Sequence, residues 1–236
     1  MLQTSAPPPD GATLSPAERS TTFATVSMPA KPVSGEEQAR ADLYALLARL
    51  FLAAPDAALL DALSLSEPIL AQGGEPALEL AWERLTLASS VMDPQAVREE
   101  FDALFIGIGT PLLNPYGSRY IAGFINDTPL AELRADLARL GLARVRGSAE
   151  FEDHIGALCE AMRVLVGGAP GIKPQPLERQ RAFFEVHLAP WYERALNDIA
   201  GAEGANYYRL VAQLADAFLA IEADAFAVEE RSNEQS

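Results

Sequence analysis

The sequence has little cysteine and few basic side chains, and both shortages exclude classes of protein. Cys159 is the only cysteine, so the chain forms no internal disulfide and holds no cysteine-rich zinc site. Eighteen Lys and Arg face 33 Asp and Glu, which gives a net charge of −15. Such a surface repels the phosphates of nucleic acids and of anionic membranes. It attracts a basic partner, such as a peptide carrying arginines, although solubility alone explains many acidic compositions.

Long apolar runs and the common catalytic motifs are missing as well. No stretch of 18 or more apolar residues occurs, and the first basic residue, Arg19, is followed by no apolar core. We therefore expect a cytoplasmic protein with neither a secretory signal nor a membrane span. P-loop, HExxH and GxSxG patterns are absent, and Gly107-Ile108-Gly109 follows no strand and lacks the third glycine of a dinucleotide site. No motif therefore predicts an enzyme, a bound cofactor or a metal.

The sequence does contain a long series of helical patterns. Hydrophobic residues make up 49 % of the chain and recur at helical spacing between Gly and Pro breaks. No segment alternates like a strand, so we predict an all-α fold, one helical bundle of about nine to ten helices over residues 35–228. Residues 1–34, rich in Pro, Ser and Thr, are predicted to be disordered, and 229–236 to form a flexible tail. The link from Ala169 to Pro176 is the predicted hinge before the C-terminal helices.

One apolar stretch, residues 101–124, interrupts the helical pattern. Its glycines and Pro111 end the preceding helix, and the segment NPYGS reads as consecutive turns. Tyr116, Tyr120 and Phe124 then recur every four residues, which predicts one face of a short helix. A loop this apolar is either packed beneath helices or held ready for a partner, and the sequence leaves both interpretations open.

Glu152, Asp153 and His154 form a polar cluster beside the most regular apolar stripe. We predict that they occupy the first turn of a helix beginning near Ser148, where carboxylates complement the helix dipole. A lone histidine on the flank of such a stripe is more often packed and hydrogen-bonded than a ligand. His154 and Cys159 are five residues apart and face different ways on a helix, so they form no nucleophile–base pair. Three adjacent residues also do not converge on a metal ion.

Three stretches in order resemble the TorD/DmsD/NarJ family of redox-enzyme maturation chaperones. They are LFIGIG…NPYGSRYIAG within residues 101–124, FEDHIGALCEAM at 151–162 and FFEVHLAPWYERAL at 183–196. The NPYGS and FEDHI forms look most like the branch associated with formate dehydrogenases. The resemblance implies an all-helical, non-enzymatic chaperone without a cofactor of its own. It would bind the apo catalytic subunit of a molybdoenzyme, often through a twin-arginine signal peptide, until the molybdenum cofactor and iron–sulfur clusters are inserted.

The same resemblance indicates which residues would bind the client. The family's acidic-histidine motif matches the cluster at 152–154, and its loop tyrosines match two tyrosines of the NPYGS region. Two departures stand out, since Phe151 replaces a common proline and Gly117 replaces a glutamate found in some branches. A basic signal peptide with an apolar stretch needs an apolar groove with acidic edges. The predicted client-binding residues are Tyr116, Ser118, Arg119, Tyr120, Phe124, Glu152, Asp153 and His154.

Two other functions remain open at this point. A small helical enzyme or metal-binding protein would use His154, or His187 in the third stretch. An adaptor without an assembly role would bind the finished molybdoenzyme as well as its apo form. The client could also be held by its folded or unfolded body rather than by a signal peptide. The chain is expected to be a monomer or a dimer that exchanges segments across the predicted hinge.

Overall fold

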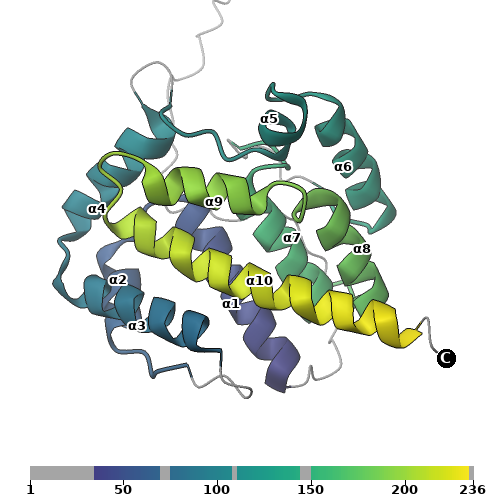
Figure 1. Ribbon diagram of the computed structural model, residues 1–236, viewed down its shortest axis with the longest axis horizontal. Helices are drawn as coiled ribbons and strands as arrows, with labels where there is room; N and C mark the ends of the chain where they lie inside the picture. Colours follow the sequence, from purple (N-terminus) through teal and green to yellow (C-terminus); the bar gives the residue numbers. More distant parts are fainter. Residues whose placement is uncertain (1–34, 70–74, 108–110, 144–149, 234–236) are drawn as a thin grey trace, which may run out of the picture.

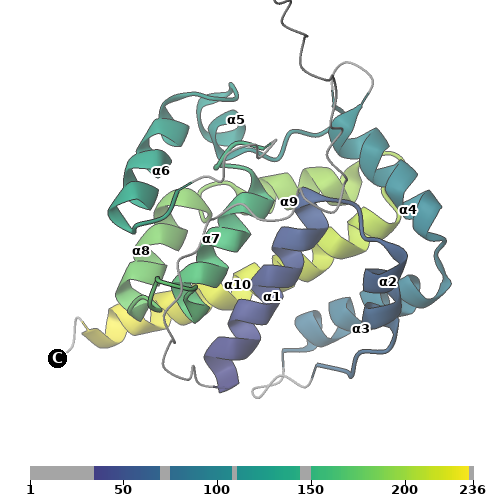
Figure 2. The same ribbon diagram turned by 180° about the vertical axis from the view of Figure 1, so that it is seen from behind.

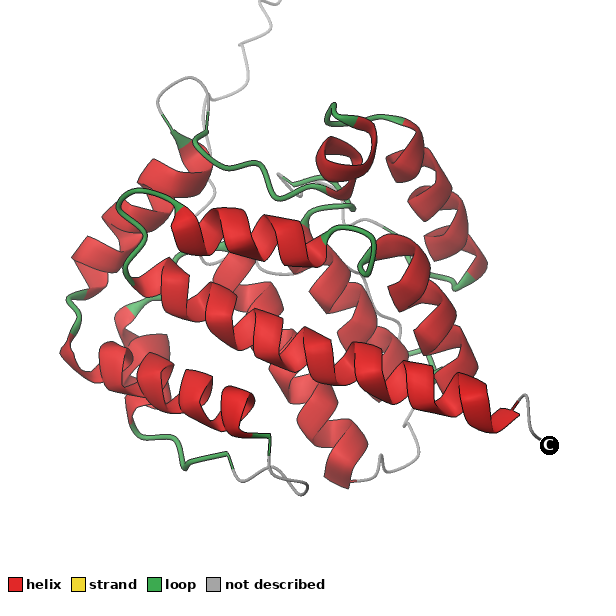
Figure 3. Ribbon diagram, viewed as in Figure 1, coloured by secondary structure: helices red, strands yellow, loops and turns green. Residues whose placement is uncertain are grey.

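The computed structural model describes residues 35–69, 75–107, 111–143 and 150–233, so the predicted disordered segment 1–34 lies outside the described residues. Within these ranges the chain forms helices and no strand, which confirms the predicted all-α fold (Figures 1 and 3). None of the described helices is long and apolar enough to cross a membrane. The helices are α1 (Gly35–Leu52), α2 (Ala57–Ser64), α3 (Pro76–Val91), α4 (Pro94–Phe101), a π-helical segment η2 (Asp102–Ile106), α5 (Gly117–Ala122), α6 (Thr128–Arg139), α7 (Ile155–Gly167), α8 (Leu177–His187), α9 (Tyr192–Gly201) and α10 (Tyr207–Asn233).

Helix α7 is the central helix of the bundle. Ten of its 13 residues are buried, and both α1 and α8 pack against it. Figure 2 shows α1 and α7 side by side. Gly156 permits this close approach, because a Cβ at that position would lie 2.8 Å from Leu52 Cγ and 3.2 Å from the Ala48 carbonyl oxygen. The start of α7 is therefore held tightly against α1.

Helix α10 is the longest helix, with 27 residues, and crosses the bundle in contact with α9 and α3 (Figure 1). Glu100 of α4 caps its first turn. The Glu100 carboxylate accepts hydrogen bonds of 2.8–3.1 Å from the backbone N–H groups of Asn206, Tyr207 and Tyr208. An anion at a helix N-terminus satisfies unpaired donors and complements the helix dipole. This contact therefore fixes where α10 starts and joins it to α4.

A buried ion pair joins α1 to α10. Glu222 is 2 % exposed, and its carboxylate accepts hydrogen bonds from Arg40 Nε at 2.6 Å and Arg40 Nη2 at 2.7 Å. The Tyr44 hydroxyl donates to the same carboxylate at 3.0 Å. The Arg40 guanidinium also lies 5.7 Å from the centre of the Phe226 ring. The two helices are thus held in one register by a network in which each charge has a partner.

Two features of the helices differ from the sequence prediction. Helix α7 begins at Ile155 rather than near Ser148, because His154 has an extended backbone with ψ of 138°. The last helix runs to Asn233, beyond the predicted end at Val228. Because α7 begins at Ile155, the cluster at residues 152–154 lies just before this helix and not in its first turn.

The link predicted to be a hinge folds back on the end of α7. Ala169 and Ile172 exchange backbone hydrogen bonds of 2.8 and 2.7 Å, and Gln175 N donates to Leu165 O at 2.7 Å. The link therefore has a defined path between α7 and α8. Motion about it, and a dimer formed by exchange across it, stay predictions.

Candidate functional site

The loop before α5 packs against the residues just before α7. Gly117 N donates to Asp153 O at 2.9 Å, and Ile155 N donates to Pro115 O at the same distance. These backbone bonds pair two segments that are far apart in the sequence. The backbone of the loop is therefore packed, and it brings the two predicted clusters of residues together.

Asp153 has the contacts expected of a residue that holds a ligand. It is 3 % exposed, and its Oδ2 accepts hydrogen bonds from Ser118 N at 2.8 Å and Ser118 Oγ at 2.6 Å. Its other oxygen, Oδ1, is buried and has no hydrogen-bond partner among the described residues, which by itself identifies no ligand. Leaving a buried carboxylate oxygen without a donor is costly. A donor from another molecule would satisfy it.

Glu152 makes a different contact. It is 8 % exposed, and its two oxygens accept hydrogen bonds from Arg134 Nε at 3.1 Å and Arg134 Nη2 at 2.9 Å. Two parallel bonds between a guanidinium and a carboxylate fix both groups in one geometry. Glu152 therefore ties the segment before α7 to α6 through an arginine of its own chain.

His154 is the N-cap residue of α7. Its Nδ1 accepts a hydrogen bond from Gly156 N at 3.1 Å, and its ring lies edge-on to Tyr116 with ring centres 5.0 Å apart. Burial lowers the pKa of His154 to about 4, against the opposing effect of the Glu150 and Asp153 carboxylates. The imidazole is therefore neutral at pH 7, and His154 is a packed, hydrogen-bonded residue.

The lowered pKa of His154 predicts that acid destabilises the fold. In the unfolded chain the histidine binds a proton below about pH 6.5, whereas in the folded chain its pKa is about 4. Stability should therefore fall as the pH drops from about 6.5 to about 4. The variant His154→Asn keeps an acceptor for Gly156 N but cannot titrate. Chemical unfolding at several pH values should show a weaker acid dependence for the variant, and an unchanged dependence would contradict this assignment.

Tyr116, Tyr120 and Phe124 do not share one helix face, contrary to the prediction from their spacing. Helix α5 is short, and Gly123 ends it in a left-handed conformation with φ of 91°. Phe124 consequently lies beyond the helix, where it is 74 % exposed. Arg119 is also exposed, and its guanidinium donates a hydrogen bond to the Gly123 carbonyl. The surface near the end of α5 is therefore apolar but does not include Tyr116.

Tyr120 packs against the C-terminal helices. Its ring stacks on Trp191 with centres 5.5 Å apart, and its hydroxyl donates to Asp198 Oδ2 at 2.7 Å. Trp191 also lies against Gly117, where a Cβ would be 3.1 Å from Trp191 Nε1. A glutamate at position 117 would fit only if Trp191 shifted. The close contact with Trp191 is therefore a steric reason for glycine, rather than the glutamate of some branches, at position 117.

A cavity of about 150 Å³ lies beside Asp153, between α5, α6 and α8. Ile121 and Val186 line it, and they are 46 % and 54 % exposed. Glu132 and His187 add polar groups, and the described residues of the lining include no Lys or Arg. The cavity therefore combines apolar walls with carboxylates, as a basic and partly apolar ligand requires. The described residues that line it are Gly117, Ile121, Pro129, Glu132, Leu133, Asp153, Val186, His187 and Pro190.

His187 is fixed at the edge of this cavity. Its Nε2 lies 2.8 Å from Asp136 Oδ2, and its carbonyl accepts a hydrogen bond from Trp191 Nε1 at 2.7 Å. Burial lowers the pKa of His187 to about 4, so the neutral ring donates its N–H to Asp136 at pH 7. The sequence singles out His187 but gives no sign of Glu132, because an exposed glutamate on α6 looks like any solvated residue.

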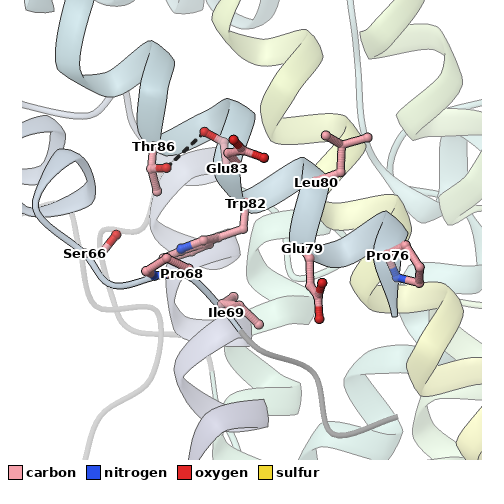
Figure 4. Close-up of a pocket in the computed structure, with 9 residues that line it drawn as sticks. All are labelled: Ser66, Pro68, Ile69, Pro76, Glu79, Leu80, Trp82, Glu83 and Thr86. Atoms are coloured by element: carbon pink, nitrogen blue, oxygen red, sulfur yellow. Dashed lines mark hydrogen bonds between the residues drawn. The ribbon is translucent and has the colours of Figure 1, made fainter. Parts of the chain in front are cut away.

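The described residues contain no group of three or more His, Cys, Asp or Glu side chains that could hold a metal ion. Cys159 is fully buried, and burial raises the pKa of its thiol. Another hollow of about 400 Å³ lies beside α3, where Trp82 and Pro68 line it with Glu79 (Figure 4). It includes none of the residues predicted from the sequence. The cavity beside Asp153 is therefore where the predicted cluster and an open surface meet.

Comparison with protein-family models matches residues 72–197 to the family described as nitrate reductase delta subunit. The match covers just over half of the 236 residues. The matched range includes the loop before α5, the segment before α7 with which it pairs, and all the described residues that line the cavity beside Asp153. A search of curated proteins finds no match.

Proposed function

Because the chain belongs to the nitrate reductase delta subunit family, a family of molybdoenzyme maturation chaperones, we propose that it binds the cofactor-free catalytic subunit of a molybdoenzyme. In this proposal the chain is a cytoplasmic chaperone with no catalytic activity of its own. It would keep the client open until the molybdenum cofactor and iron–sulfur clusters are inserted. The resemblance of the NPYGS and FEDHI segments favours formate dehydrogenase as that client.

The observation that carries the binding mode is the unpaired Asp153 oxygen beside the acidic cavity. A guanidinium of a twin-arginine signal would donate to Asp153 Oδ1 and lie near Glu132. The apolar part of the signal would cover Ile121, Val186 and the exposed Phe124. Both Glu152 oxygens accept hydrogen bonds from Arg134. We therefore propose that the client's arginine contacts Asp153 rather than Glu152.

Recovery of bound proteins tests this function directly. The tagged chain would be used in a pull-down from the native cytosol, followed by mass spectrometry and metal analysis. We expect a molybdoenzyme catalytic subunit that lacks molybdenum, and its identity would name the client. Recovery of only the metal-loaded enzyme would favour an adaptor. If no redox subunit is recovered and the chain itself carries stoichiometric metal, the chaperone proposal fails.

A further inference from the structure

A further groove lies between α3 and α10. None of the residues predicted to bind a client lines it. Its volume is about 380 Å³. The two helices run antiparallel, since Ser89 near the end of α3 bonds to Tyr207 at the start of α10, with hydroxyl oxygens 3.0 Å apart. Figure 1 shows the two helices side by side. The groove lining is Glu75, Ala77, Leu80, Ala81, Arg84, Gln213, Asp216, Ala217, Ala220, Ile221 and Asp224.

The floor of this groove is apolar and made of small side chains. Alanines from both helices line it, and Leu80, which is 45 % exposed, stands at its edge. Figure 4 shows Leu80 on the opposite side of α3 from Ile69 and Glu79. Small residues let a third helix approach to the usual packing distance of about 8–10 Å. From Gln213 to Asp224 the groove follows about three turns of helix.

The rims of the groove are acidic. Glu75, Asp216 and Asp224 are exposed, and Arg84 is the one cation among the described residues of the lining. Partial burial and the nearby Glu193 carboxylate raise the pKa of Asp216, so its negative charge is poorly compensated. A cation placed over the rim would relieve that repulsion. A second copy of this chain, with a net charge of −15, would bring more negative charge instead.

From this combination we propose that the α3–α10 groove is a docking site for a basic amphipathic helix of another protein. The helix would place Leu or Ala side chains on the alanine floor and Arg or Lys side chains over Asp216 and Asp224. The site is separate from the cavity beside Asp153, so it does not depend on the client-binding mode proposed above.

A designed peptide tests the groove without knowledge of the natural partner. The probe is a fluorescent helical peptide of about 14 residues with Leu on one face and Arg on its flanks. Binding to the full chain is measured by anisotropy at low and high salt. We expect Asp216→Lys with Asp224→Lys to weaken binding about tenfold or more. The pair Glu99→Lys with Glu203→Lys changes the net charge equally on exposed positions elsewhere and should weaken it less than about threefold.

A variant that changes no charge distinguishes binding in the groove from nonspecific electrostatic attraction to the acidic chain. Ala220→Trp fills the floor at an exposed position and should also weaken binding about tenfold. Equal losses in the two Lys pairs, normal binding by Ala220→Trp, or no binding by the unaltered chain would each overturn the proposal.

Discussion

Replacing Asp153 by Asn is expected to weaken binding of a twin-arginine signal peptide by about 30-fold or more. Asparagine has the same shape and can still accept the two hydrogen bonds from Ser118. It removes the charge that a guanidinium would meet in the cavity and leaves that cation buried without its partner. Isothermal titration calorimetry with the purified chain and a synthetic signal peptide measures the loss.

Two controls make this result specific to the cavity. Asp61→Asn removes the same charge from an exposed position on α2 and should change the affinity less than about twofold. A peptide in which both arginines are replaced by lysine should bind the unaltered chain less tightly. The guanidinium carries five donors in one plane and can serve Asp153 Oδ1 and Glu132 together, whereas an ammonium is a more strongly hydrated point charge. If Asp153→Asn has normal helix content and binds the peptide as tightly as the unaltered chain, the proposed contact between Asp153 and an arginine of the signal is contradicted.

Arg40→Ala is expected to reduce the free energy of unfolding by about 3–5 kcal/mol. The substitution leaves Glu222, which is 2 % exposed, with only the Tyr44 hydroxyl as a donor among the described residues. An uncompensated buried carboxylate is far more costly than the loss of an exposed pair. Denaturant unfolding followed by circular dichroism gives the change.

An exposed pair formed by another arginine of α1 is the matched control. Arg49 lies 3.3 Å from Asp56, and their side chains are 50 % and 58 % exposed. Arg49→Ala should therefore cost less than about 1 kcal/mol. Replacing both Arg40 and Glu222 by Met should cost less than Arg40→Ala alone, because no buried charge remains unpaired. A similar small loss for Arg40→Ala and Arg49→Ala would show that the pair does not hold α1 to α10.

The fold could be predicted from the sequence because its helices carry regular apolar stripes. Ile155, Leu158, Met162 and Leu165 are all buried in α7, as their spacing predicts. The start of that helix could not be predicted, since His154 is held extended by bonds to a loop nearly 40 residues earlier. Periodicity describes one element at a time and contains no information about such long-range pairing.

The candidate site could be predicted only in part. The polar cluster at 152–154 can be recognised in the sequence. Its pattern does not show that Glu152 is paired with Arg134 of the same chain. Only the folded arrangement shows that Asp153 lines a cavity and that one of its oxygens has no hydrogen-bond partner in the part of the chain that the structure describes. The spacing of Tyr116, Tyr120 and Phe124 was misleading, because α5 ends at Gly123 before a stripe can form. Whether a side chain is paired within the chain or open to a ligand depends on its neighbours in space, which the sequence pattern does not give.

The most direct test of the central claim compares one catalytic subunit in two states. The client named by the pull-down would be purified without its cofactors and again after full loading, and the affinity of the chain measured for each. The account predicts tight binding of the cofactor-free subunit and at least a tenfold weaker affinity for the loaded form. Equal affinity for both forms would contradict a role in maturation and would leave an adaptor as the function.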